Sequence, residues 1–120
     1  SYWFRDPQRW EVVAFRTNDG TRVMKRVAGM PGERVAVASG NLLINGEERD
    51  FPEQLSDLHY YGYGCLASRS AYTAAGGYFV MGDYSRDSND SRFEGVLPRR
   101  SVRGRAWLRV WPLERIGFVE

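Results

Sequence analysis

The sequence predicts an all-β fold of mainly antiparallel strands, arranged as a barrel or a sandwich. Short runs rich in β-branched and aromatic residues recur along the chain, and Gly, Pro and Asn turn signals separate them at close intervals. No stretch shows a sustained helical period, so we expect no helix. A chain of 120 residues fits one domain with a modest core, and we take residues 1–120 as that domain.

The first half of the chain predicts five strands in close succession. The turn signals Asn18-Asp19-Gly20 and Asn45-Gly46 separate two pairs of them, and an Asn-Gly pair is the strongest short hairpin signal. In the third strand we expect Val35 and Val37 to point inward, because side chains alternate along a strand. The predicted strands are Trp10–Arg16, Thr21–Ala28, Glu33–Ala38, Asn41–Ile44 and Glu47–Phe51.

The second half is less regular. Residues 52–76 predict a long, variable loop in which tyrosines stand among glycines. A strand over Tyr78–Met81 then leads into the polar run Gly82–Arg92. A long final strand is expected over Val102–Val110, and Trp111-Pro112 ends it, because proline cannot donate to a sheet ladder.

Composition excludes several classes of function. The net charge is only +2 and the arginines are scattered, so we expect no nucleic-acid binding. Cys65 is the only cysteine, which excludes an internal disulfide and a thiolate metal cluster. His59 is the only histidine and lies in the Tyr-rich loop, where we expect it at the surface. We therefore predict no metal site and no cofactor. No apolar stretch is long enough to span a membrane.

Lys25 is the only lysine among 17 Lys and Arg residues. On the predicted strand it shares one face with Val23 and Val27, and Arg26 lies on the other. An amine buried between two valines would lose part of its hydration, which lowers its pKa and lets it act as a base. Alternatively, the side chain extends past its apolar neighbours and keeps its ammonium in water.

Four segments, in order, resemble conserved boxes of the type I signal peptidases. Residues 9–15 (RWEVVAF) are similar to the R-G-D-V-V-V-F strand of that family, and residues 24–33 (MKRVAGMPGE) to its K-R-V-x-G-x-P-G-D box. Residues 82–92 (GDYSRDSNDSR) resemble its G-D-N-x-x-x-S-x-D-S-R box, and residues 104–117 its C-terminal segment. The resemblance covers nearly the whole chain, and residues 52–76 are the least similar part.

The resemblance implies a serine endopeptidase that removes signal peptides from exported preproteins at the outer face of the cytoplasmic membrane. Such enzymes use a serine nucleophile and a lysine general base, without a cofactor. By motif position Lys25 is the implied base and Ser88 the hydroxyl that orients its amine, although Ser88 could simply stabilise a turn.

The resemblance also implies two ion pairs, Arg26 with Asp83 and Arg92 with Asp90, that hold the 82–92 box against the lysine strand. The alternative for these four residues is solvated surface charge, which stabilises a fold by only about 0–1 kcal/mol per pair.

The family's nucleophile box, roughly S-x-S-M-x-P-T, occurs nowhere in the sequence. In the family this box lies upstream of the R-G-D-V-V-V-F strand and follows a membrane anchor, so we expect this chain to begin downstream of both. The nucleophile also supplies part of the family's oxyanion hole. We therefore expect the chain alone to be soluble and inactive in cleavage.

Other positions depart from the family pattern. Trp10 stands where the family has glycine, and Glu11 and Glu33 stand where it has aspartate. Tyr84 replaces an asparagine in the 82–92 box, and the centre of that box is shuffled.

Two questions stay open from the sequence. The aromatic residues Trp3, Phe4 and Trp10 could face a membrane surface or lie in the core. The chain could also come from a non-catalytic relative that assists assembly of surface structures, or be a β-rich interaction module, although a lone retained lysine favours the enzyme.

Overall fold

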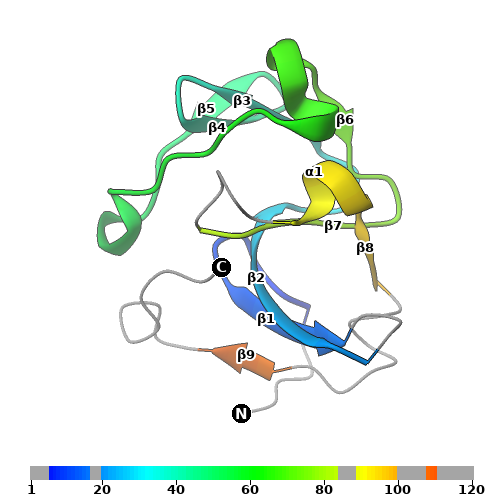
Figure 1. The fold of residues 1–120 in the computed structure, drawn as a ribbon. Helices are drawn as coiled ribbons and strands as arrows, with labels where there is room; N and C mark the ends of the chain where they lie inside the picture. Colours follow the sequence, from blue (N-terminus) through cyan, green and yellow to red (C-terminus); the bar gives the residue numbers. More distant parts are fainter. Residues whose placement is uncertain (1–5, 17–19, 84–88, 100–107, 111–120) are drawn as a thin grey trace.

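The protein is described here by a computed structural model that covers residues 6–16, 20–83, 89–99 and 108–110. The described strands form two sheets (Figure 1). The strand order is β8-β7-β2-β1-β9 in the first sheet and β5-β4-β3-β6 in the second. Every described strand pair is antiparallel, as an all-β fold of this kind predicts.

The strands are short, and four of the seven described strand pairings join strands that follow one another in sequence. The first sheet consists of β1 (Val12–Arg16), β2 (Arg22–Gly29), β7 (Gly77–Met81), β8 (Leu97–Pro98) and β9 (Leu108–Val110). The second consists of β3 (Arg34–Ala38), β4 (Asn41–Ile44), β5 (Glu47–Arg49) and β6 (Tyr72–Thr73). Of the predicted final strand, residues 102–107 lie outside the described part of the chain.

The hairpin at Asn45-Gly46 is confirmed. It joins β4 to β5, and both turn residues have positive φ angles, 53° and 85°. A two-residue turn of this type needs left-handed backbone at both positions, which Asn and Gly adopt most easily. Val35 and Val37 are also buried, as their alternation along β3 predicted.

The prediction of no helix is wrong within the part of the chain that the structure describes. A single turn of helix, α1 (Ser91–Glu94), follows the polar run, because the Asp90 carboxylate accepts a hydrogen bond from the Arg92 amide and caps the turn. One turn is too short to produce a helical period. The predicted loop over residues 52–76 likewise contains two short 3₁₀ helices, η1 (Glu53–Leu55) and η2 (Gly64–Arg69), and β6.

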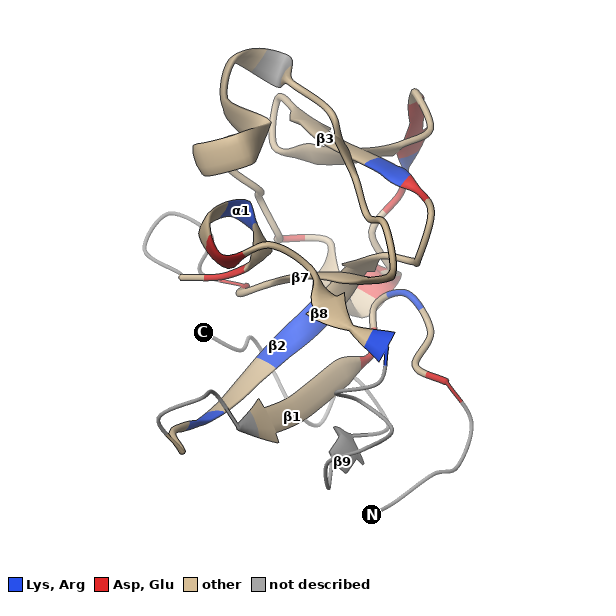
Figure 2. Cartoon of the chain, turned by 90° about the vertical axis from the view of Figure 1, so that its right-hand side faces the viewer, with Lys and Arg blue, Asp and Glu red and all other residues tan. Residues whose placement is uncertain are grey.

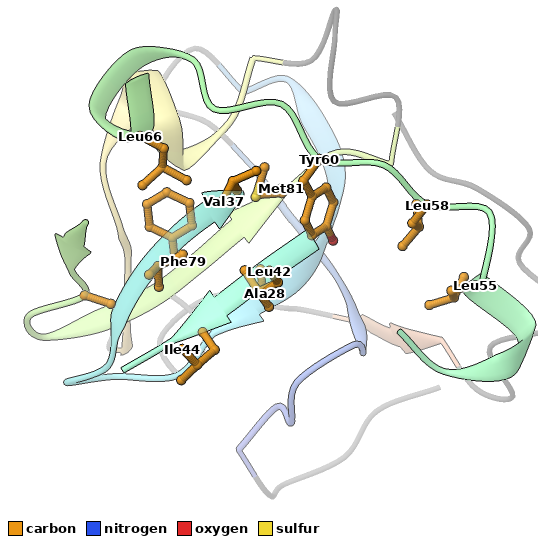
Figure 3. Close-up of a cluster of buried hydrophobic side chains, with 12 residues drawn as sticks. Ala28, Val37, Leu42, Ile44, Leu55, Leu58, Tyr60, Leu66, Phe79 and Met81 are labelled. Atoms are coloured by element: carbon orange, nitrogen blue, oxygen red, sulfur yellow. The ribbon is translucent and has the colours of Figure 1, made fainter. Parts of the chain in front are cut away.

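The main core lies between the two sheets and takes residues from both (Figure 3). Phe79 and Met81 of β7 meet Leu42 and Ile44 of β4 there, and the leucines of the 52–76 segment pack against the same cluster. That segment is therefore held by side-chain burial, although its backbone is irregular. Within the described residues, no helix is both long and apolar enough to cross a bilayer.

Candidate functional site around Lys25

Lys25 is buried in the middle of β2, with an exposed fraction of 9%. Its cross-strand neighbour on β1 is Val13, and directly opposed residues of antiparallel strands share a face. Val13 belongs to a second apolar cluster, together with Val27, Tyr78 and Val80. The lysine thus lies on an apolar face of the first sheet, which is the environment predicted for it. Figure 2 shows the basic segment of β2 where this strand runs beside β7.

Arg26 lies on the opposite face of β2 and is completely buried. Its Nε and Nη2 donate to the two carboxylate oxygens of Asp83 at 2.9 and 2.8 Å. The strand register brings Arg26 and Asp83 together, because Arg26 pairs with Met81 on β7 and Asp83 follows Met81 by two residues. The third arm of the guanidinium, Nη1, donates to the Trp10 carbonyl at 2.8 Å. The predicted pair is present, and both of its side chains are buried rather than solvated.

The pair of Arg92 and Asp90 is also present and buried. Its role in holding the box against the lysine strand stays a prediction. Asp90 accepts from Arg92 Nε at 2.8 Å and from the Gly82 amide at 3.0 Å, so it closes the loop that begins at residue 82. Arg92 Nη1 donates to the Tyr61 carbonyl at 2.8 Å. This pair therefore joins the ends of the 82–92 box and ties the box to the Tyr-rich segment. Both residues lie at the start of α1, where Asp90 is the N-cap and Arg92 lies in the first turn.

Ser88 lies outside the described residues, as do Tyr84, Trp3 and Phe4. On either side of the segment 84–88, the described chain is held by buried carboxylates, Asp83 bound to Arg26 and Asp90 bound to Arg92. The contact between Ser88 and Lys25 stays a prediction.

A further ion pair was not predicted from the sequence. The two terminal nitrogens of Arg9, Nη1 and Nη2, donate to the Glu33 carboxylate at 2.7 and 2.9 Å, and Nη1 also donates to the Ala28 carbonyl. Glu33 accepts from the Met30 amide at 2.6 Å. Burial alone would raise the pKa of Glu33, but the Arg9 and Met30 hydrogen bonds and the Arg9 charge together lower it. The sequence carried only one sign of this pair, which is that Arg9 and Glu33 both lie in segments that resemble family boxes.

Trp10 and Tyr60 were also missed as parts of this region. Trp10, at the position where the family has glycine, has a φ angle of 75°, in the left-handed region that glycine favours. Tyr60 is 1% exposed, and its hydroxyl has no hydrogen-bond partner among the described residues.

His59 is exposed, as predicted, and its ring lies against Tyr61. The described residues contain no cluster of three or more His, Cys, Asp or Glu side chains that could hold a metal ion.

Comparison with known proteins decides the family. The sequence profile described as "Signal peptidase, peptidase S26" matches residues 1–111. The chain belongs to the signal peptidase family. It is 34% identical to the probable signal peptidase I-2 of Synechocystis sp. over 99% of its length, and 34% identical to a signal peptidase I of Leptolyngbya laminosa over 98%. The chain spans 55% and 59% of those two relatives.

Solved structures place the fold in the same family. A crystal structure of a signal peptidase I from Enterococcus faecalis matches with a TM-score of 0.63 and 32% sequence identity. The match covers 82% of this chain and 94% of that structure. The two-sheet architecture found here is therefore that of a signal peptidase.

Proposed function

We propose that the protein to which this chain belongs is a signal peptidase I-type serine endopeptidase, with Lys25 as its general base. The observation that carries the proposal is the burial of the single lysine on an apolar face of β2, within a chain of this family. A buried amine is disfavoured as the ammonium, so we expect the pKa of Lys25 to lie below the ordinary lysine value of about 10.4.

In the proposed reaction the neutral Lys25 amine accepts the proton of a serine hydroxyl as the serine oxygen attacks the scissile carbonyl. The ammonium then returns that proton to the leaving amine, and the acyl-enzyme is hydrolysed by water with the same amine as base. We assign the nucleophile to the family's S-x-S-M box, which this sequence does not contain. Ser88 is proposed to orient the amine.

The two buried ion pairs have a supporting role in this proposal. Arg26 with Asp83 sets where the 82–92 box leaves β7, and Arg92 with Asp90 closes that box on itself. Neither pair is proposed to touch substrate. We further propose that residues 1–120 act as one unit of the catalytic core, with the segment 52–76 as its variable part.

We propose signal peptides of exported preproteins as substrates, cleaved at the outer face of the cytoplasmic membrane. Substrate and enzyme would then meet at the membrane surface, and no nucleic acid or cofactor takes part. Cleavage is expected after small residues at the minus-three and minus-one positions.

The test is the rate of preprotein cleavage by the full-length gene product across pH. Lys25→Arg keeps a positive charge but cannot accept a proton, so it should be as inactive as Lys25→Ala, with a loss of about 10²–10⁴-fold. Ser88→Ala removes one orienting hydrogen bond and should lose only about tenfold. If Lys25→Arg keeps substantial activity, Lys25 is a structural cation and the proposal is wrong.

A further inference from the structure

Trp10 forms part of an irregularity where β1 meets β2. The Trp10 amide donates to the Val27 carbonyl at 2.8 Å, but the Val27 amide donates to the Glu11 carbonyl, also at 2.8 Å. In a regular antiparallel pair both bonds would join the same two residues. Two residues therefore oppose one, which is a β-bulge, and the first bulged residue has the left-handed backbone typical of glycine.

The bulge has a direct consequence for Arg26. Because the Val27 amide binds Glu11, the Trp10 carbonyl is released from the ladder and accepts from Arg26 Nη1 at 2.8 Å. The other two arms of this fully buried guanidinium bind Asp83. The conformation of Trp10 thus supplies a carbonyl acceptor for Nη1, the guanidinium arm of Arg26 that does not bind Asp83.

A left-handed conformation costs a residue other than glycine about 1–3 kcal/mol and persists only where its surroundings enforce it. Here the surroundings are aromatic. The Trp10 ring meets Phe51 edge-on, with ring centroids 5.3 Å apart, and Phe51 meets Tyr60 edge-on at 5.4 Å. Each such ring contact contributes about 0.5–1.5 kcal/mol beyond burial. The two contacts together are therefore comparable in free energy to the cost of the left-handed backbone at Trp10.

The far end of this row of rings is fixed as well. The Tyr60 amide donates to the Gly40 carbonyl at 2.9 Å, and Tyr60 is buried between the two sheets (Figure 3). The charges of both ion pairs act on its hydroxyl. Burial has the largest effect and raises the pKa of Tyr60, and Asp83 and Asp90 also raise it, whereas Arg26 and Arg92 lower it. The row therefore runs from the bulge that precedes β1 to Tyr60 in the segment 52–76.

We propose that Trp10, Phe51 and Tyr60 form an aromatic column that positions the Lys25 site: it holds the bulge that binds Arg26, and so fixes β2 and the start of the 82–92 box. The three are positioning residues, and the column couples the variable segment to the base. The inference rests on the proposed role of Lys25 and extends it to residues on other elements.

The single lysine permits a direct test in the 120-residue chain, prepared without a lysine-containing tag. Lysine labelled with ¹³C at Cε gives one side-chain signal, and its shift across pH reports the pKa of Lys25. Phe51→Leu keeps an apolar side chain but removes both ring contacts. We expect it to loosen β2, admit water and raise the Lys25 pKa by at least about half a unit, a threefold change in proton affinity.

Three further variants separate positioning from general stability. Trp10→Gly removes the ring and the backbone strain together, so the bulge and its carbonyl contact with Arg26 should persist without the column. We expect this variant to shift the pKa less, and to destabilise the chain less, than Phe51→Leu does. Tyr72→Leu is the matched control, because it removes an aromatic contact with Phe79 that lies outside the column. It should destabilise the chain and leave the Lys25 pKa unchanged. Tyr60→Phe keeps the column and should leave the Lys25 pKa as it is in the wild type.

The outcomes distinguish this inference from the function on which it rests. A lowered wild-type pKa that does not move in Phe51→Leu would overturn the column and leave the role of Lys25 intact. Equal shifts in Tyr72→Leu and Phe51→Leu would also overturn it, because the effect would then be general loosening. A wild-type Lys25 that titrates as an ordinary lysine would overturn the base assignment itself.

Discussion

Lys25 and Arg26 are neighbours in the chain but point to opposite faces of β2. Lys25 lies on the face of the apolar cluster around Val13 and Val27, whereas Arg26 has all three guanidinium arms bound. Arginine stays charged at any pH at which a protein is folded, so it can anchor a buried carboxylate. Lysine can lose its proton when it is desolvated, so only this position can carry the proposed base chemistry.

Tyr60→Phe should stabilise the chain. The Tyr60 hydroxyl is buried without a partner among the described residues, and an unsatisfied buried hydroxyl costs about 1–3 kcal/mol. Phenylalanine keeps the ring contact with Phe51 and removes that cost, so we expect a gain of about 1 kcal/mol in the free energy of unfolding. Urea denaturation measures it. A loss of stability instead would mean that the hydroxyl has a partner in solution.

The Arg9–Glu33 pair should give the chain a stability that depends on acid pH. The folded pKa of Glu33 is lowered from its ordinary value of 4.5, so its contribution is fully present above about pH 4.5 and disappears as pH falls through the lower folded value. The difference in unfolding free energy between wild type and Glu33→Gln should therefore shrink over that acid range.

At the scale of elements, β2 is the centre of the first sheet and the site is built around it. β1 pairs with it along residues 22–26, and β7 pairs with it from residue 26 onward. The 82–92 box leaves β7 beside the lysine for this reason. The turn α1 then packs on β7 and η2 (Figure 1), and Asp90 caps it while also binding the Gly82 amide.

Asp83→Asn should destabilise this arrangement strongly, because it leaves the buried Arg26 charge without its counter-ion. Breaking one side of a buried pair costs about 3–5 kcal/mol. Replacing both partners with apolar residues, Arg26→Met with Asp83→Leu, should recover much of the loss, since no buried charge then remains. Urea denaturation of the two variants gives the comparison. A double variant no more stable than Asp83→Asn would show that the pair specifies the structure as well as balancing charge.

At the scale of the molecule, the two sheets share one core. Phe79 of the first sheet is fully buried in the same cluster as Leu42 and Ile44 of the second. Neither sheet can lose its partner without exposing this apolar surface, so the sheets should unfold together.

Phe79→Ala tests that cooperativity. Removing a buried phenylalanine side chain costs about 3–5 kcal/mol, a large share of the roughly 5–15 kcal/mol that stabilises a domain. We expect a single transition at lower urea, seen at the same midpoint by tryptophan fluorescence and by far-ultraviolet circular dichroism. Separate midpoints would mean that the sheets unfold independently. Phe79→Leu, which leaves a smaller cavity, should lie between this variant and the wild type.

Much of the fold could be predicted from the sequence, because the signals are local. The Asn45-Gly46 turn, the alternation that buries Val35 and Val37, and the apolar neighbours of Lys25 all depend on residues a few positions apart. The motif order also identified the family, which the comparisons confirm. The single turn α1 was missed because its cause is one side-chain cap rather than a periodic pattern.

The contacts that hold the candidate site together were decided by the tertiary structure. The sequence by itself determined which residue is the proposed base, since it contains one lysine and places it on an apolar strand face. It could not show that Trp10 forms a bulge, that Arg9 meets Glu33 across 24 positions, or that Tyr60 lies close to both ion pairs. Those contacts join residues far apart in the chain, and they form only when strand register and burial bring the two sheets together.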